Sequence, residues 1–114
     1  MENFEAQWQR VIQFFKQKFT DGEMPQMDTI LFLIGVQELG MIKPKFTKDE
    51  KLNLMHVATC KLLEPYGYYE FSHFDDEGWP HYNKEKNIEK MLPQEQEELM
   101  KEAIINYFDD NKLI

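Results

Sequence analysis

The sequence contains few of the residues on which small folds and active sites often depend. Its 114 residues include one cysteine, Cys60, so no disulfide forms within the chain and a disulfide-stabilised secreted scaffold is excluded. Five glycines are scattered singly, and no glycine-rich phosphate loop, G-x-S-x-G turn, H-E-x-x-H helix or paired C-x-x-C motif is present. The absence of these patterns favours a protein that is not an enzyme.

Basic residues are in the minority. The chain has 13 lysines and arginines against 21 acidic residues, a net charge of -8. Such a surface repels phosphate backbones and anionic lipids, so we expect neither nucleic-acid binding nor membrane docking. The longest wholly apolar segment, residues 30–36, is too short to cross a bilayer, which needs about 20 residues. Because residues 1–5 contain no basic region before an apolar run, we expect no signal peptide and a cytoplasmic location.

Hydrophobic periodicity predicts a mainly α fold in a single domain, residues 1–114. Because residues 30–36 have no polar face, they predict a second helix buried at the centre of a four-helix bundle-like domain. The other three helices carry apolar stripes at three- and four-residue steps. Three helices leave part of the central helix uncovered, which favours a homodimer. The predicted helices span residues 3–20, 26–40, 48–64 and 93–109.

Local signals support these helix boundaries. Asn3 can cap the first helix, Thr47 and Glu50 form a capping box for the third, and Pro93 suits the first turn of the fourth. Gly35, inside the second helix, costs about 1 kcal/mol relative to Ala, which predicts close approach by a neighbouring helix. For the third helix the sequence predicts one apolar face, made of Leu52, Met55, His56, Thr59, Leu62 and Leu63, with Val57 and Ala58 beside it.

Between the third and fourth helices the periodicity changes. Seven aromatic residues lie between Tyr66 and Tyr82. From Tyr69 to His73 the pattern has a period of two, with aromatic and imidazole side chains on one face, and residues 76–78 form a turn signal. The sequence therefore predicts a short β-hairpin or an ordered aromatic loop between these helices.

This aromatic and acidic segment is the first candidate site. Aromatic residues with a few polar groups dominate protein interfaces and also line small-molecule pockets. The main hypothesis is an interaction module that binds a protein partner or a second copy of the chain. A small-molecule pocket, or a lid that merely covers the helical core, uses the same residues. The predicted binding residues are Tyr68, Phe71, Asp76, Glu77, Trp79 and Tyr82.

A divalent metal is the alternative for the same segment. His73, Asp75 and His81 supply two imidazoles and a carboxylate, a ligand set that suits Zn²⁺, Fe²⁺ or Mn²⁺ if the chain folds back between them. His56 and Glu77 are possible additional ligands. The competing interpretation is a solvated turn with the two histidines paired across a hairpin.

His56 and Cys60 lie four residues apart on the third helix, so both side chains project to one side. They could serve as metal ligands, or the imidazole could activate the thiolate. The structural interpretation, which we favour, is a histidine at the edge of the core and a small buried apolar group.

Overall fold

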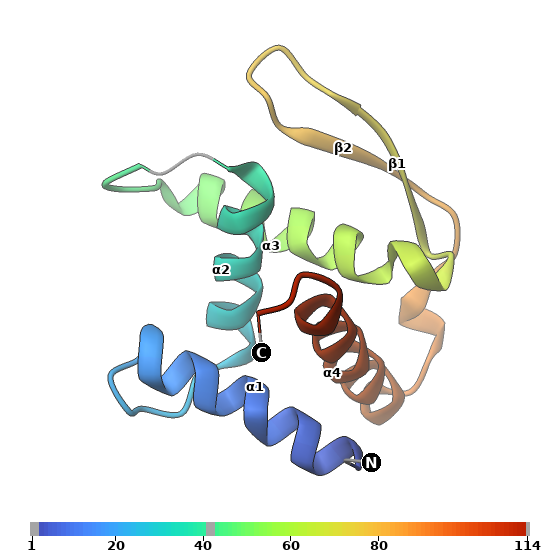
Figure 1. The fold of residues 1–114 in the computed structure, drawn as a ribbon. Helices are drawn as coiled ribbons and strands as arrows, with labels where there is room; N and C mark the ends of the chain where they lie inside the picture. Colours follow the sequence, from blue (N-terminus) through green and yellow to red (C-terminus); the bar gives the residue numbers. More distant parts are fainter. Residues whose placement is uncertain (1–2, 41–42, 114) are drawn as a thin grey trace. The chain divides into compact units, whose positions relative to one another are not determined.

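The structure, a computed structural model, describes residues 3–40 and 43–113, and within these ranges it is mainly α (Figure 1). Its helices are α1 (Phe4–Lys18), α2 (Met27–Leu39), α3 (Lys48–Leu63) and α4 (Pro93–Asp110), with short 3-10 helices η1 (Glu64–Tyr66) and η2 (Ile88–Lys90). Strands β1 (Tyr69–Phe74) and β2 (Pro80–Lys84) form an antiparallel hairpin between α3 and α4. The predicted fold class, four helices with a hairpin after the third, is confirmed.

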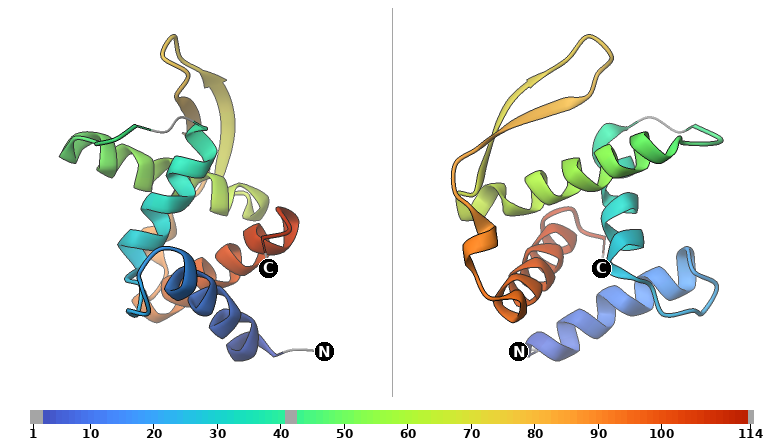
Figure 2. Two further views of the ribbon diagram at one scale, coloured as in Figure 1. Left: turned by 60° about the vertical axis from the view of Figure 1, so that its left-hand side comes forward. Right: turned by 180° about the vertical axis from the view of Figure 1, so that it is seen from behind.

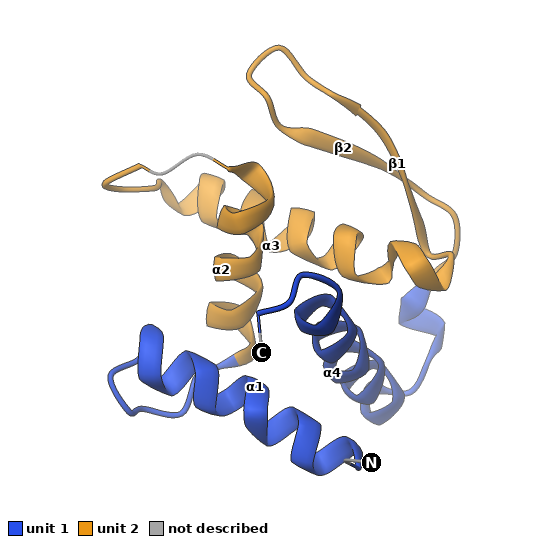
Figure 3. Cartoon of the chain, viewed as in Figure 1, with its two compact units in different colours: residues 1–26, 88–114 blue, residues 27–87 orange. Residues whose placement is uncertain are grey.

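The chain divides into two compact units, residues 1–26 with 88–114 and residues 27–87 (Figure 3). One bundle-like domain centred on the second helix, and a homodimer that completes it, stay predictions. Residues 1 and 2, which belong to the segment where we expect no signal peptide, lie outside the described residues. Among the described helices, none is both long and apolar enough to cross a membrane.

The first unit pairs α1 with α4. The side chain of Asn3 accepts a hydrogen bond from the backbone N–H of Ala6 at 2.8 Å, so the predicted helix cap is confirmed. The rings of Phe14 and Phe15 lie 5.1 and 5.5 Å from the ring of Phe108 on α4. The buried residues of α1 are Trp8, Val11, Ile12 and Phe15, and those of α4 are Ala103, Ile104, Ile105, Tyr107 and Phe108.

The second unit is built on the crossing of α2 over α3, which all three views show (Figures 1 and 2). A Cβ added to Gly35 would lie 2.1 Å from the carbonyl oxygen of Leu54, so the two backbones are in contact. The close approach predicted at this glycine is confirmed. The capping box of α3 is confirmed too, because Thr47 and Glu50 exchange side-chain and backbone hydrogen bonds at 2.9 and 3.1 Å.

The face predicted for α3 is correct at its C-terminal end, where Leu62 and Leu63 are buried, and wrong at Leu52 and His56. Leu52 is 53% exposed and His56 is also exposed. The buried residues are Leu54, Val57, Ala58, Cys60, Leu62 and Leu63. Leu52, Leu54 and Met55 lie on different sides of the N-terminal half of α3, so periodicity alone does not select a face. The contact between Leu54 and Gly35 selects it.

The hairpin contains a β-bulge that the sequence pattern did not predict. The strand register shifts between Phe71 and His73, so Ser72 is an extra residue on β1. Because of this residue, the ring of Phe71 packs against that of Phe74, 5.0 Å away, and not on the side of His73. The strict period of two predicted from Tyr69 to His73 is therefore wrong beyond Phe71.

Candidate functional site between α3 and the hairpin

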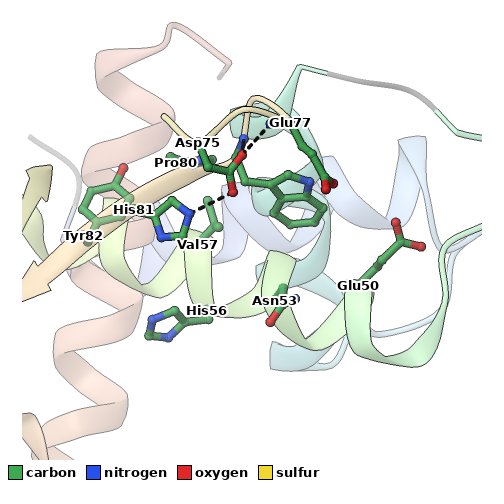
Figure 4. A pocket seen from close by; sticks show the side chains of 10 residues that line it. Glu50, Asn53, His56, Val57, Asp75, Glu77, Pro80, His81 and Tyr82 are labelled. Atoms are coloured by element: carbon green, nitrogen blue, oxygen red, sulfur yellow. Dashed lines mark hydrogen bonds and ion pairs between the residues drawn. The ribbon is translucent and has the colours of Figure 1, made fainter. Parts of the chain in front are cut away.

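The hairpin runs back along α3, and the two elements enclose an open cleft of about 400 Å³ (Figure 4). One wall comes from residues 50–57 of α3 and the other from β2 and the hairpin turn. The α3 wall consists of Glu50, Asn53, His56 and Val57. The hairpin wall consists of Asp75, Glu77, Trp79, Pro80, His81 and Tyr82.

Asp75 organises the hairpin wall. Its Oδ1 accepts hydrogen bonds from the backbone N–H groups of Glu77 and Trp79, at 2.9 and 3.0 Å, and these bonds close the turn. Its Oδ2 lies 2.9 Å from Nε2 of His81 (Figure 4). The bond to His81, followed by the bond to the Trp79 backbone, lowers the pKa of this carboxyl below its ordinary value of 3.8. Asp75 is therefore ionised at neutral pH and fixes the positions of Trp79 and His81.

The two hairpin histidines lie side by side. His73 and His81 are register partners, and their rings stack with centroids 4.9 Å apart and planes within 6° of parallel. Nδ1 of His73 lies 2.8 Å from the hydroxyl of Ser72. The interpretation of these histidines as a pair across a hairpin is confirmed.

Of the three predicted metal ligands, the structure brings Asp75 and His81 into direct contact. Both carboxylate oxygens of Asp75 already accept hydrogen bonds within the turn. Among residues 3–40 and 43–113, no group of three or more His, Cys, Asp or Glu side chains is arranged to hold a metal ion. A metal at His73, Asp75 and His81 stays a prediction.

The α3 wall carries a second fixed carboxylate. Glu50 forms an ion pair with Lys43 and also accepts a hydrogen bond from the backbone N–H of Thr47 at the start of the helix. These contacts lower the pKa of Glu50. The hydrogen bond from Lys43 is the largest cause and the one from the Thr47 backbone is the second. Other polar groups of the cleft take no part in such contacts. Within the described part of the chain, the Glu77 carboxylate and the Asn53 amide make no hydrogen bond or ion pair.

Cys60 contacts His56 of the cleft and is 1% exposed. Its Sγ is 3.4 Å from Nε2 of His56. The imidazole ring of His56 also packs against the ring of Tyr69 in an edge-on arrangement. Burial raises the pKa of the Cys60 thiol to about 11, so the thiol is protonated at neutral pH. The prediction of a small buried apolar group is confirmed, whereas an imidazole-activated thiolate does not fit this burial.

A second hollow, of about 380 Å³, lies in the same unit and includes the aromatic face of the hairpin. Phe71 and Phe74 are 38% and 63% exposed there, and the ring of Tyr82 packs on Phe71 at 5.7 Å. Burial, followed by the charges of Glu64 and Glu38, raises the pKa of Tyr82 to about 12. This hollow is lined by Glu38, Lys61, Glu64, Phe71, Phe74, Pro80 and Tyr82.

The predicted binding residues do not share one surface. Glu77 and Trp79 line the cleft, Tyr82 lines both hollows, and Phe71 lines only the second. Two others line neither hollow: Asp76 is exposed at the hairpin turn, and Tyr68 precedes β1 under the ammonium group of Lys86 at 5.5 Å.

Of the α3 wall, the sequence indicated only His56, as a possible additional metal ligand. Glu50, Asn53 and Val57 are spaced three and four residues apart, so they lie on one side of the helix. That spacing was the available signal, but nothing local indicates that the hairpin folds back over this side.

Comparisons with protein-family models, with curated proteins and with solved structures find no match for this chain. Its function is therefore argued from the chemistry of the cleft. The cleft has three carboxylates and an indole, and neither lysine nor arginine among its lining residues. Such a site attracts a cation and repels a phosphate or a carboxylate.

Proposed function

We propose that this chain is a non-enzymatic interaction module that binds a lysine or arginine side chain of a protein partner in the cleft between α3 and the hairpin. The observation that carries the proposal is the lining of the cleft. It combines Glu50, Asp75 and Glu77 with Trp79 in a hollow of about 400 Å³. Binding pockets for small groups commonly have volumes of about 300–1,000 Å³, so one side-chain head group and its stem fit this space.

Glu77 and Trp79 have the leading roles. The Glu77 carboxylate has no partner among the described residues, whereas Glu50 pairs with Lys43 and Asp75 bonds to His81. A cation entering the cleft can therefore pair with Glu77 without breaking an existing ion pair. The indole of Trp79, held by the turn that Asp75 closes, offers a ring face for a cation–π contact.

The chemistry of the cleft supports recognition over catalysis. His81 and Asp75 form an imidazole–carboxylate pair, but among the described residues no serine, threonine or cysteine lines the cleft to act as a nucleophile beside it. The nearby thiol of Cys60 is buried and protonated. The carboxylates also oppose a phosphate-bearing substrate, in agreement with the net charge of -8.

The test uses a defined ligand. The capped tripeptide Gly-Arg-Gly is titrated against the ¹⁵N-labelled protein, and the same peptide with citrulline in place of arginine serves as the uncharged control of equal shape. We expect the arginine peptide to bind with a dissociation constant on the order of 1 mM or tighter, and binding to weaken with salt. The shifted amide signals should belong to residues of α3 and the hairpin turn. Equal shifts with the citrulline peptide, or no shifts, would refute the proposal.

Matched variants locate the site. Glu77→Gln removes the uncommitted carboxylate, whereas Glu70→Gln removes a carboxylate on β1 that does not line the cleft. We expect the first to weaken binding of the arginine peptide about three- to tenfold and the second to change it less than about twofold. Trp79→Leu, which keeps apolar bulk but removes the ring face, should also weaken binding. Equal effects of the two glutamine variants would show that net charge, and not the cleft, attracts the peptide.

A further inference from the structure

We infer that the second hollow binds an aromatic side chain of the same partner whose lysine or arginine occupies the cleft. The partner is then a basic segment that carries an aromatic residue close to its cation. This inference rests on the proposed function and adds a second determinant to the ligand. It begins from the β-bulge at Ser72.

The bulge places two phenylalanines on one face of β1. Side chains three positions apart lie on opposite faces of a regular strand, but the extra residue Ser72 brings Phe74 to the side of Phe71. Their rings lie 5.0 Å apart. Tyr82 is the register partner of Phe71 on β2, and its ring lies 5.7 Å from that of Phe71. The hairpin therefore contributes three aromatic rings to the lining of the second hollow.

These rings are open to a further ring. Phe74 is 63% exposed and Phe71 is 38% exposed, so their mutual contact leaves much of both side chains in solvent. The ring planes are inclined by 57° between the two phenylalanines and by 77° between Phe71 and Tyr82. Aromatic rings favour such tilted contacts at 4.5–7 Å, and exposed apolar side chains gathered in one place mark interaction sites. The hollow, of about 380 Å³, is within the usual range of binding pockets.

Charge favours a basic partner over a second copy of the chain. Glu38 and Glu64 line the hollow together with Lys61, so acidic groups outnumber the basic one. A symmetric dimer through this surface would bring the same acidic groups of two copies together, and each copy carries a net charge of -8. A segment with a cation beside its aromatic residue meets attraction at this surface instead.

The second hollow and the cleft adjoin within one compact unit. Pro80 and Tyr82 of β2 line both, so one short extended segment can reach the two spaces. Oε2 of Glu64 accepts a hydrogen bond from the backbone N–H of Phe71 at 3.0 Å, so this N–H of β1 is not open to a partner strand. We therefore expect recognition through side chains and not through an added strand.

The experiment uses capped peptides in which one to four glycines separate an arginine from a phenylalanine. An extended chain advances about 3.4 Å per residue, so these spacers cover separations of about 7–17 Å. Each peptide has a partner in which alanine replaces the phenylalanine, and both are titrated against the ¹⁵N-labelled protein. We expect at least one phenylalanine peptide to bind about tenfold or more tightly than its alanine partner. The phenylalanine should also add shifts to amide signals of β1.

Matched variants assign the gain to the second hollow. Phe74→Ser removes the more exposed phenylalanine ring, whereas Leu52→Ser removes a side chain of similar exposure, 53%, that lines neither hollow. The gain from the peptide phenylalanine should fall below about threefold in the first variant and persist in the second. Because the gain compares two peptides on the same variant, any change in the cleft that affects both peptides cancels.

The outcomes separate the two proposals. If no phenylalanine peptide bound more tightly than its alanine partner, while arginine peptides still bound more tightly than citrulline peptides, the inference would fail and the proposed function would stand. If arginine peptides bound no more tightly than citrulline peptides, both would fail.

Three further results would overturn the inference alone. One is a gain that survives in Phe74→Ser, since the peptide ring would then bind elsewhere. Another is a set of added shifts on the parent protein that spares β1, a result that needs no variant to fold. The third is a dimer of the parent protein, measured by sedimentation, that Phe74→Ser disrupts, because the hollow would then hold a second copy of the chain.

Discussion

Nε2 of His81 lies 2.9 Å from Oδ2 of Asp75, while the other oxygen of the same carboxylate holds the backbone N–H groups of Glu77 and Trp79. One side chain thus closes the hairpin turn and orients both the indole and the imidazole of the cleft. The position of Trp79 therefore depends on the ionised state of Asp75.

Asp75→Asn should weaken the turn at neutral pH. The amide is uncharged, so the backbone N–H groups of Glu77 and Trp79 lose charge-assisted hydrogen bonds, and a donor replaces the oxygen that faces His81. We expect the amides of Glu77 and Trp79 to exchange with deuterium faster in the variant than in the parent protein.

The same carboxylate makes the stability of the folded protein depend on pH. Because folding lowers the pKa of Asp75, the unfolded chain binds more protons below the ordinary value of 3.8, and the contribution of Asp75 to stability is lost as the pH falls through the folded value. In urea unfolding, the difference in free energy of unfolding between the parent protein and Asp75→Asn should be largest near neutral pH and should shrink below about pH 4. Glu70→Gln is the control, since this exposed β1 carboxylate takes no part in the turn. If this difference in free energy of unfolding stayed constant with pH, the ionised Asp75 carboxylate would not be what stabilises the turn.

Gly35→Ala should destabilise the α2–α3 crossing. In an open helix this change stabilises by about 1 kcal/mol. Here the new Cβ would lie 2.1 Å from the carbonyl oxygen and 2.6 Å from the carbonyl carbon of Leu54, so two backbones must move apart. We expect a net loss of about 2–4 kcal/mol in the free energy of unfolding, measured with urea.

The control for this substitution is on the same helix. Gln37 is exposed on α2, so Gln37→Ala tests the effect of an added alanine without a close neighbour. It should change stability by less than about 0.5 kcal/mol. If Gly35→Ala were as stable as the parent protein, the backbone contact with Leu54 would not exist in solution.

The sequence predicts well what local chemistry determines. The capping box of Thr47 and Glu50, the cap at Asn3 and the proline in the first turn of α4 were sufficient to place helix ends within two residues. Gly35 was also informative. A glycine destabilises the interior of a helix, so its presence there indicates that a neighbouring backbone leaves no room for a side chain.

What the sequence could not predict depends on contacts between distant segments. The extra residue Ser72 leaves no mark on the hydrophobic pattern, yet it moves His73 to the other side of the strand from Phe71. The cleft also needs the hairpin to lie over Glu50 and Asn53, which belong to an earlier element of the chain. The predicted residues therefore include most of the hairpin wall but only His56 of the α3 wall, together with aromatic residues that lie elsewhere.

Cys60 should react slowly with thiol reagents in the folded protein. A pKa of about 11 leaves about one thiol in a thousand ionised near pH 8, against about one in ten at the ordinary value of 9.0. Ionisation alone therefore predicts about a hundredfold slower alkylation by iodoacetamide than in the unfolded chain, and burial at 1% exposure slows it further. The measurement compares rates with and without denaturant, and since Cys60 is the single cysteine, Cys60→Ala gives the background. A folded rate equal to or above the unfolded rate would mean that His56, 3.4 Å from the sulfur, activates the thiolate after all.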